Sequence, residues 1–152
     1  ETQSGAKSFN SELLLGSESS GKFRYDEGVE KGTLTLRFRN SDGKLLVKFA
    51  TEFVLKNNVA ELEFPSGTFK VRFDKPTKSF VLLMETFGLP EISPYEVTKG
   101  PFGIFASEAL TLSGSVDIAS TKVYKYAGTE WVELMPSSKF SSDSVIFIGS
   151  SK

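Results

Sequence analysis

The sequence contains no cysteine and no histidine among its 152 residues. These two side chains supply the ligands of zinc, blue-copper and iron–sulfur centres, and they are the usual nucleophiles and proton shuttles near neutral pH. No phosphate loop, no dinucleotide-binding glycine motif and no Gly-x-Ser-x-Gly elbow is present either. We therefore expect a protein that is not an enzyme and that carries no metal and no cofactor. Two carboxylates that meet only in the folded chain, as in a glycoside hydrolase, would escape this reasoning.

An excess of charge of one sign is also lacking, because 18 Lys and Arg residues stand against 19 Asp and Glu residues, for a net charge of −1. Such a balance gives no electrostatic reason to expect nucleic acid as a partner. No apolar run approaches the ~18 residues that a membrane-spanning helix requires. The sequence thus predicts no nucleic-acid partner and no membrane span.

The first residues are polar, except for Phe9 and the run of three leucines at 13–15. This pattern predicts a flexible polar leader over residues 1–8, followed by a single β domain over residues 9–152. A short first strand would include the leucine run and end at Gly16. A polar start at Glu1 instead of Met is typical of a chain from which an export signal has been removed, although an excised fragment would look the same. We expect a secreted, periplasmic or cell-surface protein.

Phenylalanine dominates the aromatic residues, with 14 Phe against one Trp, and it points to a β-sheet core. Apolar and polar residues alternate over 33–39 and 45–55, and Asn40, Ser41, Asp42 and Gly43 supply a turn between them. Similar alternation over 60–64 and 69–73 extends this hairpin to an antiparallel meander of four strands. Residues 79–85 are apolar enough for a strand that is covered on both faces.

The second half of the chain has weaker patterns. We expect one or two helical turns over 104–110, a strand around 116–118, a serine-rich loop over 137–144 and a last strand over 145–148. The predicted fold class is all-β: an antiparallel β-sandwich or flattened barrel of about nine strands, with at most one short helix.

The clearest candidate for ligand binding is the hairpin formed by residues 122–126 and 131–134. If Gly128 and Thr129 form its turn, Tyr126 faces Trp131, and Tyr124, Tyr126 and Trp131 share one face of the ribbon. Aromatic rings on a rigid ribbon can stack on sugars or on proline-rich peptides. The alternative is that these rings only stabilise the hairpin or cover the core.

A second candidate is the segment 86–103, which contains three prolines and three glycines and reads as a long irregular loop. Its Phe87, Tyr95 and Phe102 would form the lid of an apolar ligand site, or would pack over the open end of the sandwich.

Basic residues recur at outward positions of the predicted strands, namely at Arg37, Arg39, Lys48, Lys70 and Arg72. Glu52, Glu61 and Glu63 lie on neighbouring strands. We expect these charges to face one another across antiparallel strands on the solvent side.

Two functional hypotheses follow. The first is a non-catalytic, exported β-sandwich module that binds a glycan, a peptide or an apolar ligand, or that mediates protein interaction. The second is a carrier of lipid or another apolar ligand in a half-open β-barrel, which requires an internal cavity. Assembly through exposed edge strands also remains open.

Overall fold

The computed structural model describes residues 14–108, 111–126, 128–135, 139–142 and 144–151. These residues form 13 strands and no helix, and all paired strands are antiparallel. The strands lie in three separate sheets, none of which closes into a barrel. The all-β prediction is confirmed as a sandwich, with more strands than the nine expected.

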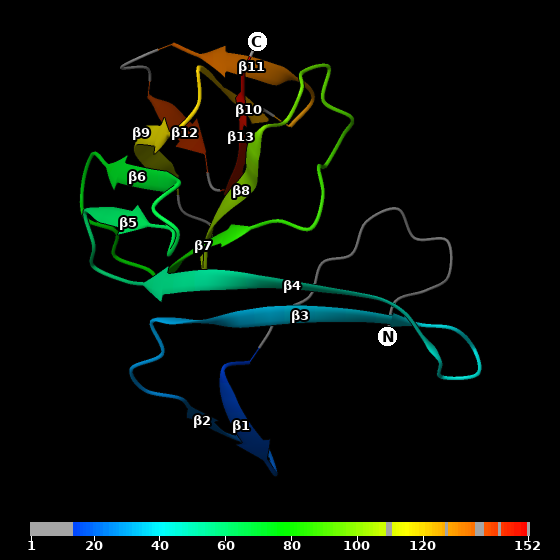
Figure 1. Ribbon diagram of the computed structural model, residues 1–152. Coiled ribbons are helices and arrows are strands. Elements are labelled where there is room, and N and C mark those ends of the chain that lie inside the picture. Colours follow the sequence, from blue (N-terminus) through cyan, green and yellow to red (C-terminus); the bar gives the residue numbers. More distant parts are fainter. Residues whose placement is uncertain (1–13, 109–110, 127, 136–138, 143, 152) are drawn as a thin grey trace.

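The larger sheet has seven strands, and its order in space differs from the order in sequence (Figure 1). The strands are, in spatial order, β11 (Trp131–Leu134), β10 (Lys122–Tyr126), β13 (Ser144–Ser150), β8 (Lys99–Ala106), β7 (Val81–Glu85), β4 (Leu45–Lys56) and β3 (Lys31–Arg39). The strand latest in sequence, β13, thus lies inside the sheet between β10 and β8, and β3 forms a free edge.

The second layer of the sandwich is a four-stranded sheet, which consists in spatial order of β12 (Phe140–Ser142), β9 (Leu112–Ile118), β6 (Phe69–Phe73) and β5 (Glu61–Glu63). A separate hairpin of β1 (Gly16–Ser19) and β2 (Lys22–Tyr25) precedes β3 and pairs with neither layer.

The core lies between these two layers and is rich in phenylalanine. Phe102 of β8 stacks on Phe69 of β6, with ring centroids 4.8 Å apart, and Phe69 also contacts Phe147 of β13 at 5.7 Å. All three rings are buried. Phe140 meets Phe147 edge to face, which ties β12 to the opposite sheet. Aromatic contacts of this kind add to the free energy gained from burying apolar area.

Both hairpins that the sequence predicts are confirmed. β3 pairs with β4, and the side-chain oxygen of Asn40 accepts the amide N–H groups of Asp42 and Lys44 in the turn between them. Gly43 has φ +79°, a conformation that favours glycine. β10 pairs with β11, and Tyr126 lies directly opposite Trp131.

The predicted meander of four strands is wrong. β4 pairs with β3 and β7, whereas β5 pairs with β6 in the other sheet, so the chain changes layers at Asn57 and Asn58. Asn58 has φ +51°, which turns the chain sharply there. The strands before and after this change of layer show the same alternation of apolar and polar residues. Alternation indicates that one face of a strand is buried, but it does not indicate which strand is the pairing partner.

Three boundaries also differ from the predictions. Within the described residues, which begin at Leu14, the first strand begins at Gly16 instead of ending there. Strand β8 occupies 99–106, so the irregular loop ends at residue 98 and no helical turn forms at 104–106. The serine-rich segment contains the short strand β12. The predicted leader, residues 1–8, lies outside the described residues.

Candidate functional site

The loop of residues 86–98 crosses the face of the seven-stranded sheet that points away from the core. Tyr95 stacks on Tyr124 of β10, with ring centroids 3.7 Å apart and an angle of 13° between the rings. Tyr124 is only 2% exposed as a result, and Ile148, its cross-strand neighbour on β13, is fully buried. Thr98 fixes the end of the loop, because both its amide and its hydroxyl donate to the carbonyl oxygen of Gly149. The loop is therefore anchored to the sheet at both a ring and a backbone group.

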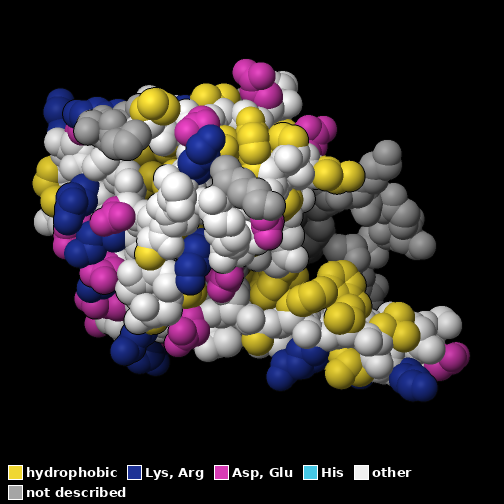
Figure 2. Space-filling model, turned by 45° about the horizontal axis from the view of Figure 1, so that its top comes forward, with side chains coloured by type: hydrophobic (Ala, Val, Ile, Leu, Met, Phe, Trp, Pro, Cys, Tyr) yellow, Lys and Arg dark blue, Asp and Glu magenta, His cyan; other side chains and the backbone are white. Residues whose placement is uncertain are grey.

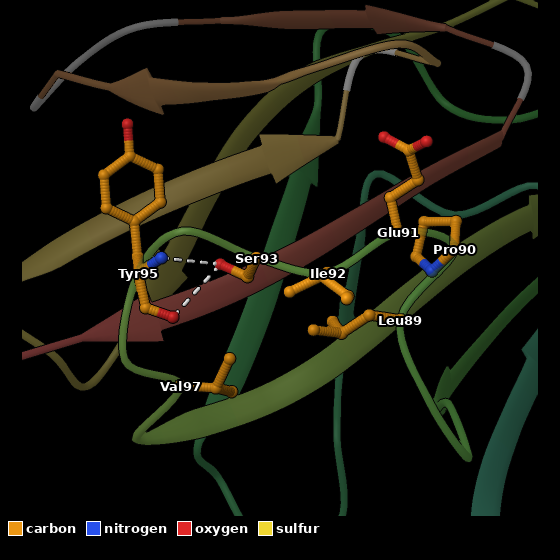
Figure 3. A pocket seen from close by; sticks show the side chains of 7 residues that line it. All are labelled: Leu89, Pro90, Glu91, Ile92, Ser93, Tyr95 and Val97. Carbon is orange, nitrogen blue, oxygen red and sulfur yellow. Dashed lines mark hydrogen bonds between the residues drawn. The ribbon is translucent and has the colours of Figure 1, made fainter.

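A hollow of about 450 Å³ opens in this loop (Figure 3). Its lining is mainly apolar and comprises Leu89, Pro90, Glu91, Ile92, Ser93, Tyr95 and Val97. The Ser93 hydroxyl accepts the amide N–H of Tyr95 and donates to its carbonyl oxygen, both at 3.1 Å, which shapes the turn before the tyrosine. The Ser93 hydroxyl is therefore already hydrogen-bonded within the loop. Glu91 is the only charged side chain of the lining.

Ile92 is the most exposed large apolar side chain of the described residues, at 95%. Burial of an isoleucine side chain would stabilise a fold by roughly 1.5–3 kcal/mol. The exposed Ile92 contributes almost none of this free energy to the folded chain. Its position at the rim of the hollow makes it a natural first contact for an apolar ligand.

The aromatic hairpin lies on the same sheet face as this loop. The rings of Tyr126 and Trp131 are 5.4 Å apart, and both residues are half-buried. The Tyr126 hydroxyl donates to the carbonyl oxygen of Gly128 in the turn. The Trp131 Nε1 atom is buried without a hydrogen-bond partner among the described residues, so a ligand at this indole would meet ring carbons and not the N–H group.

The six candidate residues from the sequence therefore fall into three environments. Tyr95, Tyr126 and Trp131 are half-buried and keep part of their surface exposed, and of these three only Tyr95 lines the hollow. Tyr124 is covered by Tyr95, and Phe102 lies in the core, so neither presents a surface to an external ligand. Phe87 is half-buried and contacts Phe49 of β4 at 5.7 Å, towards the other end of the sheet.

Sequence reasoning missed Leu89, Ile92 and Val97, whose side chains point towards the same space in Figure 3. Their signal was present in the sequence, since all three are apolar residues within a long proline-rich loop. The sequence predicts Leu89 and Ile92 as buried or half-buried residues of the loop and not as ligand contacts, and for Ile92, which is 95% exposed, that prediction is wrong.

The basic row predicted from the sequence is divided between two surfaces. On the four-stranded sheet, Lys70 lies 3.0 Å from Glu63 and 3.5 Å from Glu61, while Arg72 lies 3.2 Å from Glu61. The hydrogen bond to Glu63, with the charge of Glu61, raises the pKa of Lys70 above its usual value. Here the expected pairing of opposite charges is confirmed. On β3 and β4 the prediction that opposite charges face one another is wrong, because Arg37 lies directly opposite Lys48.

Within the described residues, no group of three or more acidic side chains is placed to hold a metal ion. The same part of the chain contains no helix long and apolar enough to cross a membrane.

Comparison of the chain with protein-family models, with curated proteins and with solved structures returned no match.

Proposed function

We propose that this chain is a non-catalytic β-sandwich module that acts outside the cytoplasm and binds an apolar group of a peptide or glycan in the hollow of loop 86–98. The observation that carries the proposal is the anchored loop with an open, mainly aliphatic hollow and a fully presented Ile92 at its rim. Binding residues often lie on loops held by a rigid scaffold, as this loop is held by the Tyr95–Tyr124 stack. The location outside the cytoplasm rests on the sequence only.

The lining favours a peptide over a glycan. Sugar sites need several polar side chains that fix hydroxyl groups. The polar groups of this lining are the Glu91 carboxylate, the Tyr95 side chain and the Ser93 hydroxyl, which is already bonded to the Tyr95 backbone, and the other lining residues are Leu89, Pro90, Ile92 and Val97. A peptide with an apolar side chain next to a basic residue would match both features. The carrier hypothesis has less support, since stacked phenylalanine rings fill the space between the two sheets.

The single tryptophan of the chain, Trp131, provides the assay. Titration with nonapeptides that carry a central leucine, phenylalanine or proline beside an arginine, and with cellohexaose and chitohexaose, should change its fluorescence saturably for at least one peptide. Ile92→Ser should weaken that binding by about tenfold, since one apolar contact contributes on the order of 1.5 kcal/mol.

Leu46→Ser is the matched control, because Leu46 is also exposed, at 65%, but is not among the residues that line the hollow. It should leave binding unchanged. A panel without any saturable response, or equal losses in the two variants, would contradict the proposed site.

A further inference from the structure

Beyond the loop, the molecule has a second unusual surface, which we call the arm: β3 together with residues 45–52 of β4. Strand β4 pairs with β7 only over Phe53–Lys56, so the remaining residues of β4 pair with β3 alone. Figure 1 shows the two strands extending away from the sandwich as a ribbon. An isolated two-stranded ribbon is marginally stable in water, so this arm gains less from its own pairing than the strands within the layers do.

The two faces of the arm differ sharply. Phe38, Val47 and Phe49 lie on the face that points away from the core, and each is at least 40% exposed. Phe38 contacts Phe49 edge to face, with centroids 6.1 Å apart. Figure 2 shows hydrophobic side chains along this projecting part of the surface. Arg37 and Lys48 lie side by side on the opposite face.

The arm is also cationic. From the start of β3 to the end of the arm, residues 31–52 contain five Lys and Arg residues and two acidic residues, Asp42 and Glu52, a net charge of +3, whereas the rest of the chain contains 13 against 17, a net charge of −4. None of the ion pairs in the described structure includes Arg37 or Lys48. The positive charge therefore stays uncompensated within this part of the fold.

The outer edge of β3 offers backbone groups for pairing. The amide of Leu55 donates to the carbonyl oxygen of Glu30, which fixes which pairs of the β3–β4 ladder are hydrogen-bonded. Bonded pairs alternate in an antiparallel ladder, so the amide and carbonyl groups of Thr33, Thr35 and Arg37 point away from β4. No described strand pairs with β3 on that side.

Apolar and cationic side chains alternate along β3, and this alternation indicates which kind of partner fits its free edge. A flat anionic bilayer would contact either the apolar face or the cationic face, whereas an added strand places its alternate side chains on both. A second copy, paired antiparallel about Thr35, would set Lys31 opposite Arg39, which is unfavourable. An extended segment with alternating apolar and acidic residues meets neither difficulty.

We propose that the free edge of β3 binds an extended segment of another polypeptide, in which apolar residues alternate with acidic ones. Its apolar side chains pack beside Leu36 and Phe38, and its acidic side chains face Arg37 and Arg39. The added strand continues the seven-stranded sheet by main-chain hydrogen bonds, a known mode of peptide recognition. This site is separate from the hollow of loop 86–98.

The test uses a fluorescein-labelled nonapeptide of sequence Glu-Val-Glu-Val-Thr-Val-Thr-Val-Glu, which is phased for antiparallel pairing with residues 39–31. Fluorescence anisotropy with the full chain should show binding at least about tenfold tighter than for the same peptide with lysine in place of glutamate, because like charges across strands oppose binding. Arg37→Glu should remove most of this preference. A scrambled peptide of equal composition, with its valines adjacent, should bind at least about tenfold more weakly.

Thr35→Pro provides the backbone test. Its amide points to the free edge, where proline is tolerated, so β3 should still pair with β4 while the added strand loses a hydrogen bond. Circular dichroism and the melting temperature check that this variant folds, and Arg37→Glu remains informative if it does not. Equal binding of the glutamate and lysine peptides would overturn the proposal. So would absence of peptide binding, concentration-dependent dimerisation that Thr35→Pro abolishes, or peptide-independent capture by phosphatidylglycerol vesicles that Thr35→Pro leaves intact.

Discussion

Cationic residues line two antiparallel strand pairs of this protein, and the two pairs are built differently. On β5–β6, Glu61 and Glu63 lie within 3.0–3.5 Å of Lys70 and Arg72, and the strands belong to a layer that buries Val71 completely. On the arm, Arg37 faces Lys48, and the apolar face is only partly covered, by the contact of Phe49 with Phe87. Both pairs show the same alternation in sequence. The β5–β6 pair completes its charge contacts within the chain, whereas the arm leaves Arg37 and Lys48 without an ion-pair partner and its apolar face partly exposed in the described fold.

The largest expected contrast is between two phenylalanines. Phe102→Ala should cost about 3–5 kcal/mol in the free energy of unfolding, because it empties a buried site that contacts Phe64 and Phe69. Phe49→Ala on the arm should cost under about 1 kcal/mol, because Phe49 is already 40% exposed in the folded chain. Urea unfolding of both variants measures the two values. Similar losses would mean that the arm is as well packed as the core.

A smaller contrast concerns charge reversal. Arg72→Glu places a carboxylate opposite Glu61 and should destabilise the fold by about 0.5 kcal/mol. Arg37→Glu places a carboxylate opposite Lys48 and should stabilise the fold by a similar amount, roughly 0.2–0.5 kcal/mol. The two variants make the same chemical change, so opposite signs of the shift in urea midpoint would isolate the pairing. Equal signs would contradict it.

The smallest expected effect depends on pH. Lys139 hydrogen-bonds the Asp74 carboxylate at 2.7 Å and holds the pKa of Asp74 below its usual value of 3.8. Because the pKa of Asp74 is lower in the folded state than in the unfolded state, its interaction with Lys139 stabilises the fold above about pH 4. This contribution to the free energy of unfolding is lost as the pH falls through the folded-state pKa. Asp74→Asn should therefore reduce the melting temperature slightly at pH 7 and leave it unchanged near pH 2. Asp42→Asn, in the turn of the arm, is the matched control, since its carboxylate forms no ion pair with any residue that the structure describes.

Local signals were sufficient for the hairpins. The turn at Asn40–Gly43 depends on side-chain hydrogen bonds within five residues, and the facing of Tyr126 and Trp131 follows from the length of one short loop. Both could be predicted because every contact that fixes them is close in sequence.

Long-range partners could not be predicted in this way. Phe49 and Phe69 occupy equivalent positions in alternating strands, yet Phe69 is fully buried and Phe49 is not, because only the packing of one sheet on the other decides it. Tyr124 and Tyr95 are 29 residues apart, and their stack removes Tyr124 from the surface where we had placed it. The candidate hollow depends on that stack, so its aliphatic lining was visible only in the folded chain.

The position of β13 has a consequence for synthesis of the protein. Strands β10 and β8 both pair with β13 and not with each other, so a nascent chain that ends before residue 144 holds two half-sheets with no bridge between them. The larger layer can assemble only after residues 144–150 have left the ribosome. Until then the unpaired edges of β8 and β10 are open to chaperones and to neighbouring nascent chains.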